Sequence, residues 1–106
     1  MSIRRKEDET MQKAAKKSES RTIKISNESG LHARPASEFV RCVMRFKSDI
    51  TLQVNGKKLS GISIMDIMTA DIRKGAELEV IAEGVDADKA LDAIEKTLND
   101  LALKGF

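Results

Sequence analysis

The 106-residue chain is long enough for one compact domain and too short for two. Its 19 basic and 17 acidic side chains nearly balance, and only 3% of its residues are aromatic, so a surface for nucleic acid is not expected. No apolar run approaches the roughly 18 to 20 residues that cross a bilayer, and the N-terminus lacks the apolar region of a secretory signal, which predicts a cytoplasmic protein without membrane insertion.

Residues 1–20 are polar, mixed in charge and nearly free of large apolar side chains, so they cannot bury enough surface to fold alone. We interpret them as a flexible charged extension, and residues 21–106 as the folded domain. This domain opens with RTIKIS, in which Ile23 and Ile25 alternate with polar residues as in a half-buried strand. A loop follows over residues 27–30.

From Pro35, apolar side chains recur at helical spacing as far as Phe46. Proline suits the first helical position because it has no N–H to lose, and this helix should end near residues 47–49. The next stretch, DITLQV, alternates as a strand does. Asn55-Gly56 is a strong hairpin-turn dipeptide, after which residues 57–60 form a short return strand.

A second helix of about two turns should begin at Ser63, and a last strand, ELEVIA, follows the turn at Lys74-Gly75. Asp86 can cap a final helix with a sustained apolar stripe. The predicted order is β-α-β-β-α-β-α, and its hairpins favour an α+β sandwich, an antiparallel sheet with helices on one face. Cys42 has no second cysteine for a disulfide or a metal pair, so we interpret it as a packing residue.

The stretch GLHARPAS, residues 30–37, contains the only histidine and the only proline of the chain. His32 precedes a helix start, where unpaired N–H groups and the helix dipole favour an anion such as phosphate. Arg34 adds a guanidinium able to bind two phosphate oxygens. Because an uncharged imidazole can attack phosphorus, and Gly30 can adopt backbone conformations closed to other residues, the stretch predicts a reversible phosphoryl site.

Other interpretations of His32 stay open at this point. A zinc site would need further ligands, and the chain offers no second histidine and one cysteine. A Ser-His-Asp arrangement is possible because serines are plentiful, although sequence order does not locate its acid. His32 can also be an ordinary loop residue at a helix cap.

GLHARPAS, followed by NGKKLSGISIM and KGAELEVIAEG, resembles the histidine-containing phosphocarrier family, HPr, of the bacterial phosphotransferase system. The resemblance extends from about Arg21 to Asn99. It implies an HPr-like open-faced β-sandwich, a four-stranded antiparallel sheet covered on one face by three helices.

The resemblance also implies a carrier rather than an enzyme, with no cofactor and no metal. His32 would take a phosphoryl group on its Nδ1 atom from phosphorylated Enzyme I and pass it to a IIA domain of a sugar permease, and Arg34 would hold the phosphate. The protein is expected to be a monomer. The surrounding phosphate loop would be formed by Ser29, Gly30, Ala33, Pro35 and Ala36.

Ser63 matches the serine that an ATP-dependent HPr kinase/phosphorylase modifies in many members of the family. The sequence SIMD is equally a capping-box-like helix start, which needs no regulation to explain it. Gly61 and Ile62 also replace the larger residue and the lysine that are usual in regulated members. Two functions therefore stay open: sugar-transport carrier, or a regulatory or nitrogen-branch protein that signals through protein contacts and Ser63.

Family members dock their partners through apolar residues of the second helix, which implies an interface at Ile64, Met65 and Met68, although part of this helix must pack on the core. Arg41 and Arg45 lie four residues apart on the polar side of the first helix. They form either a solvated face or a basic stripe that steers acidic partners. A further departure is Asp71, which replaces a small residue and can weaken phosphate affinity or alter the choice of partner.

Overall fold

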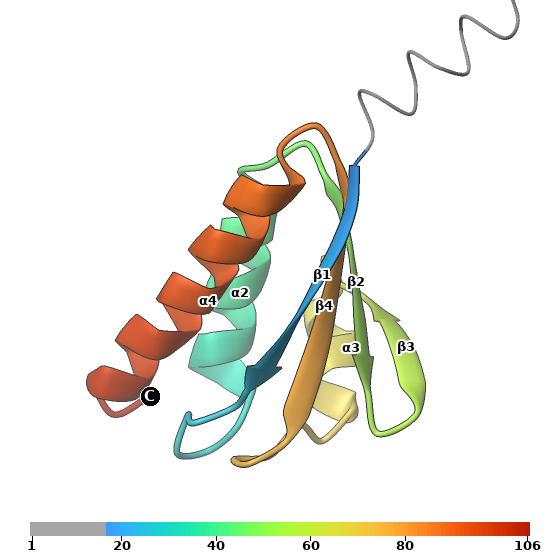
Figure 1. The fold of residues 1–106 in the computed structure, drawn as a ribbon. Coiled ribbons are helices and arrows are strands. Elements are labelled where there is room, and N and C mark those ends of the chain that lie inside the picture. Colours follow the sequence, from blue (N-terminus) through green and yellow to red (C-terminus); the bar gives the residue numbers. More distant parts are fainter. Residues whose placement is uncertain (1–16) are drawn as a thin grey trace, which may run out of the picture.

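The structure, a computed structural model, describes residues 17–106, and within them a four-stranded antiparallel sheet carries helices on one face (Figure 1). The strands lie in the order β1-β4-β2-β3. The predicted order of elements and the predicted open-faced α+β sandwich are confirmed. The elements are β1 (Lys17–Lys24), α2 (Ala33–Val43), β2 (Asp49–Val54), β3 (Lys57–Ser60), α3 (Ile64–Thr69), β4 (Glu77–Gly84) and α4 (Ala87–Leu103).

The core lies between the sheet and the helices. Alternate side chains of the central strands, such as Leu52 on β2 and Val80 on β4, are buried, because successive residues of a strand point to opposite faces. The helices add Phe39 from α2 and Ile94 from the apolar stripe of α4, both fully buried. Cys42 is a buried free cysteine, as expected for a packing residue.

Strand β1 begins four residues earlier than the sequence predicts. Residues 17–20, assigned to the extension, pair with residues 81–84 of β4. Ser18 and Ser20 are exposed, so this part of the strand shows no apolar alternation, and its backbone pairing with β4 defines it instead. The rest of the predicted extension, residues 1–16, lies outside the described residues.

Helix α2 has different bounds from the predicted ones. It begins at Ala33, so Pro35 occupies the third helical position and not the first. Proline is tolerated there for the expected reason, because N–H groups of the first turn have no intrahelical acceptor. The helix ends at Val43, short of the predicted end near residues 47–49, because the N–H groups of residues 45 and 46 donate to carbonyls only three residues back and tighten the chain into a turn.

The hairpin between β2 and β3 turns at Asn55 and Gly56, as predicted. Both residues have positive φ, +53° and +76°, which a two-residue type I′ turn requires. A Cβ added to Gly56 would meet no atom within 4 Å. Glycine is therefore needed here for its backbone conformation alone.

Asp86 stands at the N-cap position of α4, but its side chain makes no capping hydrogen bond to that helix, contrary to the prediction. The carboxylate instead accepts hydrogen bonds from the backbone N–H groups of Lys47 and Ser48, each at 2.9 Å, and from the Ser48 hydroxyl. The segment that leads from α2 into β2 is thereby tied to the start of α4. Sequence separation of nearly forty residues hides this pairing from local patterns.

We expect part of the acid sensitivity of this protein to come from Asp86. The hydrogen bond from the Lys47 N–H, followed by those from Ser48, holds the pKa of the Asp86 carboxyl below its usual value of 3.8. The lowered folded pKa means that stabilisation is present above the unfolded value and is lost as the pH falls through the folded one. Urea unfolding from neutral to acidic pH should therefore show lower stability at neutral pH, and a shallower acid dependence, for Asp86→Asn.

Asp88→Asn is the matched control, because Asp88 is an exposed acid in the first turn of the same helix. It removes the same charge from the same helix end without touching the bonds to residues 47 and 48. Equal pH dependence in Asp86→Asn and the unmodified protein would contradict this role of Asp86.

Candidate functional site

His32 lies exposed at the N-cap of α2, and its side chain makes no capping hydrogen bond. The loop that presents it is anchored at two points before the histidine. The N–H of buried Leu31 donates to the carbonyl of Ile72 at 2.9 Å, and the side-chain amide of buried Asn27 donates to the carbonyl of Leu98 at 3.2 Å. A rigid support thus carries an accessible imidazole.

Gly30 lets two loops approach each other beneath His32. Its φ is +69°, in the left-handed region that favours glycine. A Cβ at this position would stand 2.0 Å from the carbonyl oxygen of Ile72 and 2.9 Å from the Cα of Arg73. The close contact between the loop after β1 and the loop before β4 therefore depends on the absence of a side chain.

The helix end leaves few backbone donors for a ligand. The Ala36 N–H donates to the His32 carbonyl at 2.8 Å, Pro35 has no N–H, and the Gly30 N–H donates to Asn27 at 2.9 Å. At the start of the helix, the amides of Ala33 and Arg34 remain for an anion. Pro35 and Ala36 are buried, whereas Ser29 and Ala33 are exposed.

The Arg34 side chain is directed toward its own helix and the C-terminus. Its Nε lies 3.5 Å from Glu38 Oε2, and its guanidinium carbon lies 4.8 Å from the centre of the Phe106 ring. Phe106 reaches this place through a turn at the end of α4, where Gly105 has φ of +92° and the Phe106 N–H donates to the Leu101 carbonyl. Sequence reasoning missed Phe106, although a glycine after the last helix signals such a turn.

A solvent-open hollow of about 390 Å³ lies beside His32, between the loop after β1 and the loop before β4. Two of its cations, Arg73 and Lys74, were not among the predicted site residues, since only the fold brings them to the histidine. The Lys74 ammonium lies 3.2 Å from a carboxylate oxygen of Glu28, and Arg73 pairs with Asp71 at 3.0 Å. The hollow is lined by Glu28, Ser29, His32, Asp71, Arg73 and Lys74.

Within residues 17–106, the groups needed for a hydrolytic triad or for a metal site are not assembled around His32. Ser29 and Asp71 line the same hollow as the imidazole, but the carboxylate of Asp71 is engaged by Arg73, so the geometry of a hydrolytic triad is not formed. Among residues 17–106, no group of three or more histidine, cysteine or acidic side chains is placed to hold a metal ion.

Ser63 is the N-cap of α3, where the sequence places it. Its hydroxyl oxygen accepts a hydrogen bond from the Asp66 N–H at 3.2 Å, which satisfies one of the unpaired donors of the first turn. The side chain is half-buried. The hydroxyl therefore has a structural role before any modification.

Helix α3 divides its apolar residues between the core and the solvent. Ile67 is fully buried and Met68 packs partly against the core. Ile62 in the preceding loop, together with Ile64 and Met65, is exposed, and Met65 exposes 68% of its surface. We call Ile62, Ile64 and Met65 the apolar surface of α3, and such a surface is typical of a contact site.

Arg41 is exposed on α2, which packs against α3. Arg45 is also exposed, but it lies in the turn after α2 and not on the helix, because α2 ends at Val43. The Arg45 guanidinium bends back toward α2, with Nη2 3.8 Å from the sulfur of Cys42. The two arginines place positive charge on and just after the helix that packs against α3.

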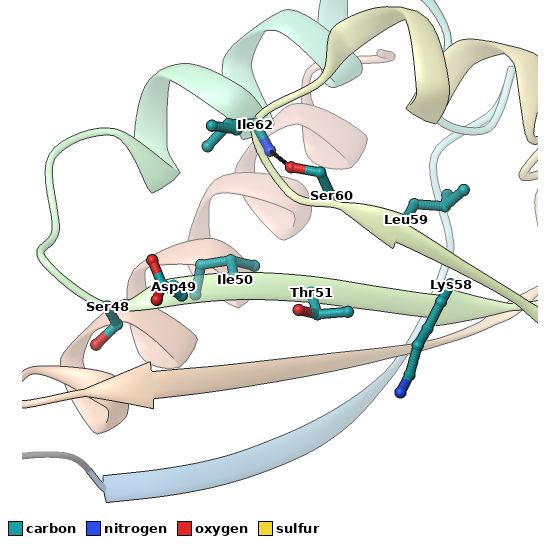
Figure 2. Close-up of a pocket in the computed structure, with 8 residues that line it drawn as sticks. All are labelled: Ser48, Asp49, Ile50, Thr51, Lys58, Leu59, Ser60 and Ile62. Atoms are coloured by element: carbon teal, nitrogen blue, oxygen red, sulfur yellow. Dashed lines mark hydrogen bonds between the residues drawn. The ribbon is translucent and has the colours of Figure 1, made fainter.

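A second hollow of about 390 Å³ lies over the β2–β3 end of the sheet (Figure 2). It shares no lining residue with the hollow beside His32 and contains neither histidine nor cysteine. The Ile62 N–H donates to the Ser60 hydroxyl at 3.3 Å where the chain leaves β3, as Figure 2 shows. This second hollow is lined by Ser48, Asp49, Ile50, Thr51, Lys58, Leu59, Ser60 and Ile62.

Known proteins resemble this chain over most of its described residues. A family model described as the PTS HPr component phosphorylation site matches residues 19–100. The chain belongs to the HPr family. The phosphocarrier protein HPr of Mycoplasma capricolum is 43% identical to it over 79 residues, which are 74% of this chain and 89% of that protein.

Solved structures of HPr proteins have the same fold. A Mycoplasma histidine-containing phosphocarrier protein has a TM-score of 0.75 and 40% identity, and covers 80% of this chain and 97% of its own. HPr from Bacillus anthracis has a TM-score of 0.72 and 36% identity, with 76% and 95% covered. As an HPr protein, the chain is a phosphocarrier of the phosphotransferase system and not an enzyme in the usual sense, and its partners are proteins of that system. None of the helices in residues 17–106 combines the length and the apolar character needed to span a membrane.

Proposed function

We propose that His32 carries the phosphoryl group, accepting it from phosphorylated Enzyme I and passing it to IIA domains of sugar permeases. The observation that carries this proposal is an exposed ring at the N-cap of α2, free of any capping bond, in the only histidine of the chain. The lone pair of Nδ1 attacks phosphorus, the bond from phosphorus to Enzyme I breaks, and its electron pair stays on Enzyme I. A second transfer of the same kind, with His32 as the donor, delivers the group to a IIA domain.

Arg34 is proposed to turn from its resting contacts toward the phosphoryl group. An exposed ion pair such as that with Glu38 contributes about 0.3 to 0.5 kcal/mol, and the cation–π contact with Phe106 about 0.5 to 1 kcal/mol. A charge-assisted hydrogen bond to a phosphoryl oxygen contributes about 1.5 to 3 kcal/mol. The exchange therefore favours the phosphorylated state, and the amides of Ala33 and Arg34 add the positive end of the helix dipole.

Incubation with phosphoenolpyruvate and Enzyme I from a bacterium with a similar HPr should place one acid-labile phosphate on each chain. Addition of a IIA domain should then remove it. Failure of Enzyme I to label the folded protein would contradict the proposed function.

We also propose Ser63 as a second phosphorylation site, used by an ATP-dependent HPr kinase/phosphorylase. The supporting observation is a half-buried hydroxyl at a helix N-cap, where the helix dipole favours a phosphate. Asp66, the donor of the capping bond, opposes it through its carboxylate. Phosphorylation here would act as a regulatory switch next to the apolar surface of α3.

With ATP and HPr kinase, we expect an acid-stable phosphate that is absent from Ser63→Ala and present in Ser60→Ala. Ser60 is the matched control, because it is an exposed serine at the end of β3. Ser63→Ala should also cost about 1 kcal/mol through loss of the cap, which urea unfolding measures. An unlabelled chain, or a label retained in Ser63→Ala, would contradict the proposal.

The proposed docking site is formed by Ile64, Met65 and the exposed part of Met68, bordered by Arg41 and Arg45. Its apolar side chains would be covered by the partner, and the arginines would speed association with acidic surfaces at low salt. Phosphorylation kinetics measured over a salt series should show this acceleration fading as salt rises.

Met65→Ala should raise the KM for phosphorylation by Enzyme I by about tenfold, the effect of removing one well-buried interface side chain. Val85→Ala is the control, since Val85 is also exposed but lies in the turn between β4 and α4, away from α3 (Figure 1). Equal kinetic constants in the two variants would refute a docking site on α3.

We further propose that the protein acts as a monomer in the cytoplasm. Successive partners need access to the same face of α3, and a free buried cysteine suits a reducing compartment. A sedimentation-equilibrium mass of two chains at micromolar concentration would contradict the monomer.

A further inference from the structure

The loop between α3 and β4 places charged side chains in the hollow beside His32 that the carrier step described above does not use. Asp71 and Arg73 both line this hollow. Their backbone is held against the histidine loop, because the Leu31 N–H donates to the Ile72 carbonyl and Gly30 packs directly against the Arg73 Cα. Arg73 therefore extends from a fixed point next to the imidazole.

Asp71 holds the Arg73 guanidinium in the unphosphorylated protein. Nε of Arg73 lies 3.1 and 3.0 Å from the two carboxylate oxygens. Asp71 has φ of +57°, a conformation that few residues other than glycine adopt. The hydrogen bond from Arg73 holds the pKa of the Asp71 carboxyl below its usual range. Asp71 thus binds the guanidinium in the hollow that His32 also lines.

Arg34 and Arg73 differ in their relation to the hollow. Arg34 lies against Glu38 and Phe106 and is not one of the residues that line it. Arg73 lines it beside His32, and both recorded hydrogen bonds to Asp71 use Nε. The two terminal nitrogens of a guanidinium carry four further N–H donors.

We propose that Arg73 is a second ligand of the phosphoryl group on His32, and that Asp71 is the resting partner from which this group draws the guanidinium. The inference rests on the proposed function, because it requires a phosphoryl group at His32. A phosphoryl group brings a charge of about −1.5 to −2 and three strong acceptor oxygens, so it attracts a guanidinium more strongly than one carboxylate does. Only hydrogen bonds are exchanged, and no covalent bond changes in this step.

The movement of Arg73 from Asp71 to the phosphoryl group also gives Asp71 a role in releasing that group. Once Arg73 has turned toward the phosphoryl oxygens, the Asp71 carboxylate is left as a negative charge in the same hollow. It repels the phosphoryl group and competes to recover the guanidinium, which favours onward transfer over retention. Arg73 stabilises the protein phosphorylated on His32, and Asp71 limits that stabilisation.

In the test, His32 is phosphorylated without Enzyme I. Phosphoramidate, a small-molecule donor that releases ammonia, transfers a phosphoryl group to imidazole, and ³¹P NMR then follows the titration of that group. The charged groups facing it are Glu28, Asp71, Arg73 and Lys74 in the hollow and Arg34 on α2. Because a nearby cation favours the more negative form, Arg73→Gln should move the titration midpoint upward by about half a pH unit, a modest shift because the side chain is well exposed to solvent.

Three further variants make the assignment specific. Asp71→Asn should move the midpoint downward, because it removes a negative charge and frees Arg73. Arg73→Lys keeps the charge but lacks the planar guanidinium, so its titration midpoint should lie between those of Arg73→Gln and the unmodified protein. Lys58→Gln removes the same charge from exposed β3 and should leave the midpoint unchanged.

Phosphorylation should also shift the Nε–H signal of Arg73 in ¹H–¹⁵N spectra, and this shift should be absent in His32→Gln. Equal midpoints for Arg73→Gln, Lys58→Gln and the unmodified protein would overturn the inference, as would an Arg73 signal that does not respond. The proposed function fails separately, if Enzyme I does not label the protein while phosphoramidate does.

Discussion

His32→Gln should fold normally and lose all detectable phosphorylation by phosphoenolpyruvate and Enzyme I. The chain has no other imidazole, and the glutamine amide has no nucleophilic nitrogen lone pair to take its place. The expected effect on stability is below about 0.5 kcal/mol, because the side chain is exposed and makes no capping bond. Autoradiography of the acid-labile label and urea unfolding measure the two effects separately.

Glu38→Gln is the matched control for this experiment. Glu38 lies one turn along α2 and pairs with Arg34, so its substitution changes charge near the site while leaving the imidazole in place. It should retain the label, and release of Arg34 from its ion pair should not slow transfer. An acid-labile phosphate that persists in His32→Gln would place the carrier residue elsewhere and contradict the proposal.

Gly30→Ala should produce the largest loss of stability among the substitutions considered. The residue would be forced to keep a φ of +69°, and its Cβ would stand 2.0 Å from the Ile72 carbonyl oxygen. Backbone strain of about 1 to 3 kcal/mol and displacement of packed atoms of about 1 to 3 kcal/mol together predict a loss of about 2 to 6 kcal/mol. Thermal unfolding should shift downward by about 10 to 30 °C, and transfer through His32 should fall because the supporting loops separate.

Gly56→Ala separates the effect of backbone strain from the effect of steric overlap. Gly56 has a similar φ of +76° but no atom within 4 Å of the added Cβ, so only the backbone term applies. We expect a loss of about 1 kcal/mol, with phosphorylation of His32 unchanged. If Gly30→Ala were as stable as Gly56→Ala, the close approach of the two loops would not matter to the fold.

Arg34 shows that the resting position of a predicted site residue depends on the tertiary structure. The sequence places a guanidinium two residues after the histidine, and the family resemblance gives it the phosphate. In the structure it pairs with Glu38 and lies over Phe106, 72 residues away in the chain. Because both contacts are weak and exposed, the side chain remains available, but its starting point is set by the C-terminal turn.

Local patterns of the sequence were sufficient for the order of the elements and for the place of His32. Alternation in β2 and β4, the Asn55-Gly56 turn and the cap at Ser63 each depend on neighbours within a few residues, and the structure has all of them. Such signals survive without tertiary information because they express backbone geometry and the burial of one face.

Only the tertiary structure decided which distant residues meet. Pairing with β4 extends β1 back to Lys17, the carboxylate of Asp86 binds the segment before β2, and the loop before β4 brings Arg73 to the hollow of His32. These contacts join residues separated by 38 or more positions, and their geometry follows from how the sheet and helices pack. No periodicity records them, since long-range pairing is a property of the whole fold and not of any one stretch of chain.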